Sequence, residues 1–390
     1  MQATVYLVQN NTLYRDGAKN MKKWKVMTVF GTRPEAIKMA PLVKALQQNT
    51  EQIDTVVTVT AQHREMLDQV LETFKIVPDY DLNIMKERQT LLDVATRGLE
   101  GLNQIMKEAK PDVVLVHGDT ATTFVASLAA FYNQVAIGHV EAGLRTWNKY
   151  SPYPEEMNRQ LTGVLADIHF APTEQAKENL LRENKEPNSI IVTGNTAIDA
   201  LATTVADDYT HPVLEAIGND RMVLLTAHRR ENLGKPMENM FRAIHRILEE
   251  HPDVQVVYPM HLNPVVRDTA RAILESHERV HLIEPLEVFD FHNFASRSYM
   301  ILTDSGGIQE EAPSLGKPVL VLRDTTERPE GIEAGTLKLA GIEEETIYDL
   351  TKELLTNSAL YNQMAKASNP YGDGHASERI VEALIAFLEK

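Results

Sequence analysis

Short β-branched runs alternate with longer amphipathic runs from Lys25 onward, and this alternation limits the possible folds more than any other feature of the chain. The pattern is typical of βα units around a parallel sheet, because buried strands read as short apolar runs and covering helices as amphipathic ones. In the first half, the predicted strands are Lys25–Phe30, Thr55–Thr60, Val113–His117, Val135–Val140 and Ile168–Ala171. The predicted helices between them include Ile37–Gln48, Met66–Phe74, Leu91–Glu108, Thr120–Tyr132 and Glu156–Leu165.

A second series with the same rhythm follows the Thr193–Asn195 turn and a polar stretch near residues 207–211. Its predicted strands are Met222–Thr226, Val254–Tyr258, His281–Ile283, Met300–Thr303 and Pro318–Leu322. Because 390 residues exceed one ordinary hydrophobic core, the two series indicate two domains. The sequence therefore predicts an α/β fold of two Rossmann-like, doubly wound parallel-sheet domains that face a cleft. Ligands of such sheets bind beyond the carboxyl ends of the strands.

The domain limits follow from the breaks in this pattern. Residues 1–20 contain no continuous apolar segment and no evident cleavage site, so we expect a poorly ordered extension rather than a secretory signal. We assign residues 21–192 to the first domain and residues 193–373 to the second. After the breaker at Asn369–Gly372, the apolar period of Ala376–Leu388 predicts a terminal helix. The pattern does not identify the surface on which this helix packs.

Composition excludes several classes of partner. Hydrophobic residues make up 43% of the chain and charged residues 24%, and no apolar run reaches the roughly 18 residues of a membrane span. The formal net charge of −16 would repel nucleic-acid phosphates and anionic lipid. The absence of cysteine excludes disulfides and thiolate metal sites. We therefore expect a soluble, cytoplasmic protein without a nucleic-acid or membrane partner.

The sequence carries no cofactor fingerprint. No glycine triplet of the dinucleotide-binding type follows the first strand, and Gly316-Lys317-Pro318 lacks the upstream glycine and the hydroxyl residue of a phosphate-binding P-loop. His277 and His281 have helical ligand spacing, but a strand is predicted to begin near Val280 and no third ligand is evident. We therefore predict neither a cofactor nor a metal ion.

Two strand ends carry candidate anion-binding residues. The first strand runs into Gly31–Glu35, and Arg33 with Lys38 could hold an anion near the start of the next helix. A proline-capped turn with a solvated arginine is the alternative. In the second half, Ser305, Gly306 and Gly307 offer hydroxyl and amide donors to a pyrophosphate, and Glu311 lies a turn further on, suited to ribose hydroxyls. A plain glycine-rich turn is the alternative there.

Polar residues after the Val319–Leu322 run add a further cation. Arg328 could bind the same diphosphate, whereas Arg323 and Glu327 could equally pair with each other as surface ions.

The acid–base candidates lie mostly in the first half of the chain. Asp119 and Glu141 both follow predicted buried strands, so their carboxylates should converge on one rim, with Glu155 as a third candidate. Neighbouring carboxylates raise one another's pKa, which lets one act as base while another holds a proton. For Asp119, capping of the following helix is the alternative. In the second half, His228 could transfer protons or bind phosphate, although a lone histidine at a strand end is more often structural.

These motifs together, in this order, closely resemble the non-hydrolysing UDP-N-acetylglucosamine 2-epimerases of bacteria. The segments that carry the resemblance are Gly31–Glu35, Val116–Thr120, His139–Thr146, Tyr153–Glu156, His228–Asn232, Asp304–Pro313 and Arg323–Glu330. Each is weak alone, and seven in register are strong. The resemblance covers the chain from about Lys25 to its end. It implies the two-Rossmann-domain architecture of many glycosyltransferases (the GT-B type), UDP bound mainly by the second domain, and a C-terminal segment (374–390) that packs back on the first.

The resemblance also implies roles for individual residues. Those matching the catalytic set are Asp119, Glu141, Glu155 and His228. Those matching the substrate and UDP site are Arg33, Lys38, Phe291, Ser305, Gly306, Gly307, Glu311 and Arg328. Those matching a second, activating UDP-GlcNAc site are Gln62, Arg88, Gln89, Glu155, Arg229 and His261.

The implied reaction is reversible inversion at carbon 2 of UDP-GlcNAc, giving UDP-ManNAc. UDP is eliminated to leave a 2-acetamidoglucal and then adds back, and the product supplies ManNAc for cell-surface polysaccharide. A homodimer is the family expectation. Three alternatives remain: a hydrolysing epimerase that releases ManNAc and UDP, a glycosyltransferase on the same architecture, and a non-catalytic UDP-sugar sensor.

Overall fold

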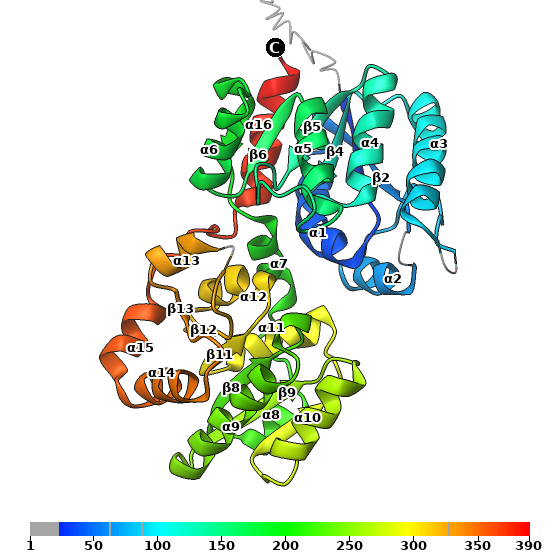
Figure 1. Ribbon diagram of the computed structural model, residues 1–390. Helices are drawn as coiled ribbons and strands as arrows, with labels where there is room; N and C mark the ends of the chain where they lie inside the picture. Colours follow the sequence, from blue (N-terminus) through cyan, green and yellow to red (C-terminus); the bar gives the residue numbers. More distant parts are fainter. Residues whose placement is uncertain (1–22, 62–63, 87–88, 327) are drawn as a thin grey trace, which may run out of the picture.

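The computed structural model describes residues 23–61, 64–86, 89–326 and 328–390, which form two α/β domains (Figure 1). Within these residues, the first domain contains a seven-stranded sheet of order β3-β2-β1-β4-β5-β6-β7 and the second a six-stranded sheet of order β10-β9-β8-β11-β12-β13. All strand pairs are parallel. In each sheet the strand order reverses at a switch point, as in doubly wound folds. The predicted pair of Rossmann-like domains is therefore confirmed. The extension at residues 1–20 lies outside the described residues.

The ten predicted strands are all present, with ends shifted by at most two residues. The first sheet contains β1 (Trp24–Phe30), β2 (Ile53–Val59), β3 (Tyr80–Asp81), β4 (Val113–His117), β5 (Ala136–Val140), β6 (Ile168–Ala171) and β7 (Ile190–Val192). The second contains β8 (Arg221–Thr226), β9 (Val254–Pro259), β10 (Val280–Ile283), β11 (Met300–Thr303), β12 (Val319–Val321) and β13 (Leu337–Leu339). The sequence missed β3, β7 and β13. These are edge strands of two or three residues, too short to carry a period.

The helices cover both sheets. Those of the first domain are α1 (Arg33–Gln48), α2 (Arg64–Thr73), α3 (Leu91–Ala109), α4 (Ala121–Tyr132), α5 (Glu155–Leu165) and α6 (Glu174–Arg182). The second domain has α8 (Pro212–Ile217), α9 (Lys235–Glu250), α10 (Pro264–Leu274), α11 (Val288–Arg297), α12 (Gly306–Glu311), α13 (Pro329–Glu333), α14 (Glu344–Thr356) and α15 (Ser358–Ala365). The 3₁₀ turns are η1 (Pro187–Ser189), η2 (Arg230–Asn232) and η3 (Ala312–Leu315). None of the helices in the described ranges is both long and apolar enough to cross a membrane.

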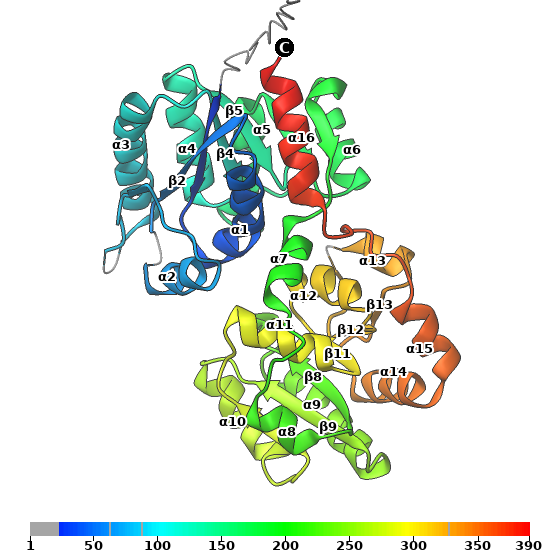
Figure 2. The same cartoon turned by 180° about the vertical axis from the view of Figure 1, so that it is seen from behind.

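Two further helices link the domains. Helix α7 (Thr196–Thr204) lies between them in both views and packs against α1 of the first domain and α11 and α12 of the second (Figures 1 and 2). The last helix, α16 (Ala376–Leu388), returns to the first domain and packs on α1, with Ile380 and Leu384 in that domain's core. Asp199 of α7 accepts hydrogen bonds from the amides of Ala376 and Ser377 at 3.1 and 2.6 Å, which fixes the start of α16. The two segments that link the domains, α7 and the start of α16, therefore contact each other.

Candidate active site

The loop after β1 is held by a buried carboxylate. Glu35 accepts hydrogen bonds from the amides of Gly31 and Thr32 at 3.0 and 2.8 Å and from the Thr120 hydroxyl at 2.6 Å. Burial raises the pKa of Glu35, and these donors oppose the rise. A Cβ on Gly31 would clash with the Thr60 hydroxyl oxygen, so only glycine allows this close approach. The capping box of Thr32 and Glu35 starts α1 at Arg33, four residues before the predicted start at Ile37.

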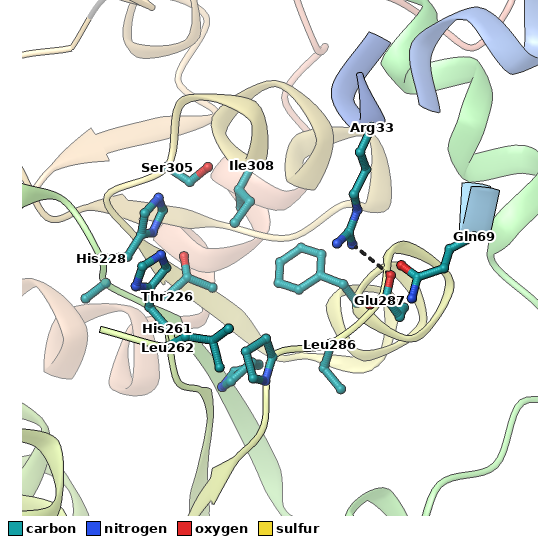
Figure 3. Close-up of a pocket in the computed structure, with 14 residues that line it drawn as sticks. Arg33, Gln69, Thr226, His228, His261, Leu262, Leu286, Glu287, Ser305 and Ile308 are labelled. Carbon is teal, nitrogen blue, oxygen red and sulfur yellow. Dashed lines mark ion pairs between the residues drawn. The ribbon is translucent and has the colours of Figure 1, made fainter. Parts of the chain in front are cut away.

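Arg33 extends from this loop toward the second domain. Its guanidinium lies 3.2 Å from the Glu287 carboxylate, and its side chain is only 21% exposed (Figure 3). The alternative of a proline-capped turn was right about the turn, since Pro34 occupies the first helical turn, but wrong about a solvated arginine. An ion pair between the domains takes its place.

A cavity of about 480 Å³ lies between the carboxyl ends of the two sheets. Arg33 and Gln69 contribute from the first domain, and most of the wall comes from the second (Figure 3). The remaining lining residues are Thr226, Ala227, His228, Pro259, His261, Leu262, Pro285, Leu286, Glu287, Phe291, Ser305 and Ile308. The cavity thus brings together five residues singled out from the sequence: Arg33, His228, His261, Phe291 and Ser305.

Asp304 orients His228 in this cavity. It is fully buried and accepts hydrogen bonds from the amides of His228 and Arg229, both at 2.9 Å, and from the Asn232 side chain at 3.0 Å. The His228 Nδ1 atom lies 3.2 Å from Asp304 Oδ1, and the His228 ring stacks on His261 with centroids 5.7 Å apart. Asp304 therefore fixes the loop after β8 and directs the free edge of His228 toward the cavity.

A buried network of opposite charges joins the domains beside the cavity. In the first domain, Lys38 donates to Glu141. In the second, Arg328 donates to Glu310 through Nε at 2.9 Å, and a terminal nitrogen of Arg328 lies 2.7 Å from the same carboxylate oxygen. Asn195, immediately before α7, donates to Glu141 at 3.0 Å and to Glu310 at 2.9 Å. Two cations and two carboxylates thus meet where the domains meet.

The two candidate carboxylates of the first domain differ in their surroundings. Burial would raise the pKa of Glu141, but the Lys38 ammonium and His117 hold it down at about 2. Burial raises the pKa of Asp119, and Glu141 and Glu155 add to the rise while Arg159, 2.5 Å away, opposes it. Glu141 is also held at a φ of +59°, a strained conformation that is common in functional sites.

The capping alternative for Asp119 is wrong. Thr120 is the N-cap of α4, and its hydroxyl accepts the amide of Thr123 at 3.1 Å. The Asp119 carboxylate instead faces Arg159 of α5. Its side chain is therefore held by α5 rather than by the start of α4.

The glycines after β11 connect the network to the cavity. A Cβ on Gly306 would lie 3.0 Å from the Arg328 guanidinium carbon, so this cation packs directly over Gly306, next to Ser305. Ser305 precedes α12, and its side chain makes no capping hydrogen bond. Gly306 therefore lets Arg328 approach the backbone closely. The alternative of a plain glycine-rich turn does not account for this contact.

Glu311 lies on the other side of α12. Its carboxylate is 3.5 Å from Nε2 of the buried His292, whose Nδ1 hydrogen-bonds the Thr204 hydroxyl at 2.6 Å. Thr204 donates its single hydroxyl hydrogen to the Ala200 carbonyl, so His292 must donate through Nδ1. His292 therefore lies next to both Thr204 of α7 and Glu311 of α12.

The residues matched to an activating site lie in different places. Gln62 and Arg88 are outside the described residues. Gln89 accepts a hydrogen bond from Arg97 at 2.9 Å in the first domain, and Glu155 begins α5. Arg229 donates to the Asp304 carbonyl at 3.1 Å, and His261 lines the cavity.

Three other residues noted in the sequence have local partners. Arg323 lies 3.2 Å from Glu231, and its other proposed partner, Glu327, is outside the described residues. His281 hydrogen-bonds Gln255 at 2.7 Å. His277 packs edge-on against His245.

Sequence reasoning gives no role to Asn195, Glu310 or Asp304. Asn195 reads only as part of a turn, and Asp304 and Glu310 stand in a motif that is noted for their neighbours. A signal for Asp304 was available, because an acid directly after a buried strand repeats the pattern that singled out Asp119 and Glu141.

The fold and the cavity define the class of this protein: it is a two-domain α/β protein of the GT-B type, with a cavity between its Rossmann-like domains. Residues 44–385 match the family model described as UDP-N-acetylglucosamine 2-epimerase. A UDP-N-acetylglucosamine 2-epimerase of Bacillus subtilis strain 168 is 71% identical over 365 residues, which cover 94% of this chain and 96% of that protein. The chain belongs to the UDP-N-acetylglucosamine 2-epimerase family, of the type found in bacteria.

Solved structures agree in fold along almost the whole chain. A crystal structure of a UDP-N-acetylglucosamine 2-epimerase is 68% identical, with a TM-score of 0.89 over 95% of this chain and 97% of that one. A UDP-GlcNAc 2-epimerase from Neisseria meningitidis, solved with UDP-GlcNAc bound, is 52% identical, with a TM-score of 0.83 over 93% of this chain and 100% of that one.

Proposed function

We propose that this protein interconverts UDP-GlcNAc and UDP-ManNAc by inverting carbon 2 of the sugar while UDP remains in the site. The observation that carries the proposal is the meeting of cations from both domains with acidic side chains beside one interdomain cavity. The names of the relatives and the UDP-GlcNAc bound to the Neisseria meningitidis structure support the same substrate.

In this proposal the second domain holds UDP. Phe291 packs against the uracil, Glu311 binds the ribose hydroxyls, and Ser305, Gly306 and Gly307 donate to the diphosphate. Arg328 and, from the first domain, Arg33 and Lys38 supply the positive charge that a departing dianion requires. Each of these three cations faces a carboxylate in the present arrangement, so binding of the diphosphate exchanges one anionic partner for another.

The chemistry follows from the position of the reacting atom. Carbon 2 of the sugar is not next to a carbonyl, so enolisation cannot make its proton acidic. A base instead removes this proton while the bond between carbon 1 and the UDP oxygen breaks, which leaves 2-acetamidoglucal and UDP. UDP then adds back to carbon 1, and an acid returns a proton to the opposite face of carbon 2.

Inversion requires proton-transfer groups on both faces of the ring. We assign this work to Asp119, Glu141, Glu155 and His228. Burial near other carboxylates raises the pKa of Asp119, whereas the Lys38 ammonium outweighs burial and lowers the pKa of Glu141. These opposite shifts support a division of labour between a carboxyl that can carry a proton and a charged carboxylate that can accept one.

We further propose activation by UDP-GlcNAc at a second site beside the cavity, formed by Gln62, Arg88, Gln89, Glu155, Arg229 and His261. A ligand that prefers the closed domains would shift the population toward the reactive state. The protein would act as a cytoplasmic homodimer that supplies UDP-ManNAc for cell-surface polysaccharide.

Product analysis by NMR tests the proposed function. Incubation with UDP-GlcNAc alone should give UDP-ManNAc at equilibrium, without an equal amount of free UDP. Stoichiometric UDP with free ManNAc would identify a hydrolysing epimerase instead. A requirement for an acceptor would identify a glycosyltransferase, and binding without conversion would identify a sensor.

A further inference from the structure

Asn195 occupies the junction at which the chain passes from the first domain into α7. It is only 3% exposed, and its backbone amide donates to the Tyr371 carbonyl at 2.7 Å, on the segment that returns toward α16. Asn195 therefore lies on the first chain segment that links the domains, before α7, and contacts the second, before α16.

Both the oxygen and the nitrogen of the Asn195 side-chain amide form hydrogen bonds. Its Oδ1 accepts the amide of Ala197 at 2.9 Å, which caps α7. Its two Nδ2 hydrogens are then directed to Glu141 at 3.0 Å and to Glu310 at 2.9 Å. If the side-chain amide were flipped, its oxygen would face the carboxylates of Glu141 and Glu310, and its NH₂ group would face the backbone N–H of Ala197. The partners thus determine a single orientation.

Glu310 extends this contact to the second domain. Its Oε2 accepts Asn195, while its Oε1 accepts Nε of Arg328 at 2.9 Å and lies 2.7 Å from a terminal nitrogen of the same guanidinium. A planar guanidinium held in this way has little freedom to rotate. One chain of hydrogen bonds therefore connects Glu141 in the first domain with the cation over Gly306 in the second.

We propose that Asn195 is a positioning residue that couples Glu141 to Arg328 through Glu310, so that the acid–base group and the phosphate-binding cation are held in one geometry. This inference rests on the proposed function, which places proton transfer at Glu141 and the diphosphate at Arg328. It adds Asn195 and Glu310 to the residues on which the reaction depends. Proton removal by the first domain and departure of the diphosphate held by the second then require a fixed position of one domain relative to the other.

The variant Asn195→Ser tests the coupling without adding charge. Serine is as good an N-cap as asparagine, so α7 keeps its cap, but its side chain is too short to bridge two carboxylates. Since misplacement of reacting groups costs about 10- to 100-fold in rate, we expect kcat to fall by that factor. The dissociation constant of UDP, measured by calorimetry, should stay within about threefold of wild type because Glu310 still holds Arg328.

The variant Glu310→Gln breaks the same link from the other side. The carbonyl oxygen of the substituted side chain can keep both contacts with Arg328, but its amide would face the Asn195 amide, donor against donor. We expect a similar loss of kcat, and the double variant should lose no more than the worse single one, because both changes cut one connection. Asn357, the exposed N-cap of α15, provides the matched control, and Asn357→Ser should retain wild-type kcat.

Three results would overturn the coupling: a kcat for Asn195→Ser within about twofold of wild type, a parallel loss of UDP affinity, or multiplicative losses in the double variant. If Asn195→Ser does not fold, Glu310→Gln decides by the same criteria. Wild-type conversion is measured first. Its absence would contradict the proposed function alone, whereas normal wild-type conversion with an unimpaired Asn195→Ser would contradict the coupling alone.

Discussion

Individual side chains at this site take their properties from their neighbours. Glu141 and Asp119 follow adjacent strands. Burial favours a raised pKa for both, but the Lys38 ammonium and His117 outweigh it and lower the pKa of Glu141 to about 2, while burial near other carboxylates raises the pKa of Asp119. Two carboxyls with separated pKa values can divide the roles of proton acceptor and proton carrier. Two carboxyl groups thus differ in pKa because of their positions.

Asp119 is the residue on which this division is tested. Asp119→Asn preserves size and hydrogen bonding but cannot take up a proton, so we expect kcat to fall at least about 100-fold, within the usual range for general acid–base groups. UDP affinity should change little. Steady-state kinetics and calorimetry measure the two effects. The exposed Asp349→Asn is the control, and a variant at position 119 with more than half of wild-type kcat would remove Asp119 from the catalytic set.

Sequence reasoning at this scale finds strand ends but not side-chain directions. Arg33, His228 and Ser305 could be predicted because each follows a strand, and the cavity brings them together. Between the adjacent Glu310 and Glu311, however, only the helical turn decides which one faces the domain junction. Glu310 is 4% exposed and bridges to Asn195, a contact between residues 115 positions apart that no local pattern encodes.

Neighbouring strands of the first sheet carry a cluster of buried histidines. His117, His139 and His169 lie on β4, β5 and β6, and burial lowers their pKa values to about 4, 3 and 4. Each is nearly inaccessible to solvent. The central strands of this domain therefore require neutral imidazoles in the folded state.

This requirement predicts acid sensitivity of the first domain. Between about pH 6.5 and 4, the unfolded chain binds protons that the folded histidines do not, so the free energy of unfolding falls as pH decreases through this window. His169→Gln removes one such group and should make the slope shallower by about 1.4 kcal/mol per pH unit.

Urea unfolding at a series of pH values measures the slope. His375→Gln, at an exposed histidine, controls for the substitution itself. A slope for His169→Gln equal to that of wild type would show that this imidazole does not contribute.

Apolar periodicity predicts the long strands and helices. The exact helix starts depend on capping residues, and the short edge strands depend on pairing with a neighbouring strand. Helix α1 begins at Arg33 rather than at the predicted Ile37, because the Thr32–Glu35 capping box and Pro34 extend the helix beyond its apolar period. The short edge strands β3, β7 and β13 exist through pairing with longer neighbours, which a single segment does not reveal.

The whole molecule is two domains held together by α7, the return to α16 and a few ionic contacts. The two series of βα units were sufficient to predict this architecture. The packing of α16 on α1 was expected only through the family resemblance, because an amphipathic terminal helix fits many surfaces. The Arg33–Glu287 pair and the Asn195 bridge both depend on how the domains are placed.

The placement of the two domains also governs the proposed activation by UDP-GlcNAc. If UDP-GlcNAc at a second site favours the closed domains, initial rates on UDP-ManNAc alone should be low and rise as product accumulates, and trace UDP-GlcNAc should abolish this lag. Continuous assays with and without the trace nucleotide sugar measure it, and an equal addition of UDP-ManNAc is the control. Linear progress curves in both cases would contradict the activation model.

The proposed reaction removes a proton from carbon 2 and returns another, from solvent, on the opposite face. NMR of UDP-GlcNAc with the protein in heavy water tests this most directly. We expect UDP-ManNAc with deuterium at carbon 2, and progressive loss of the carbon-2 proton signal from both sugars. UDP-ManNAc that keeps its original hydrogen at carbon 2, or no conversion at all, would contradict it.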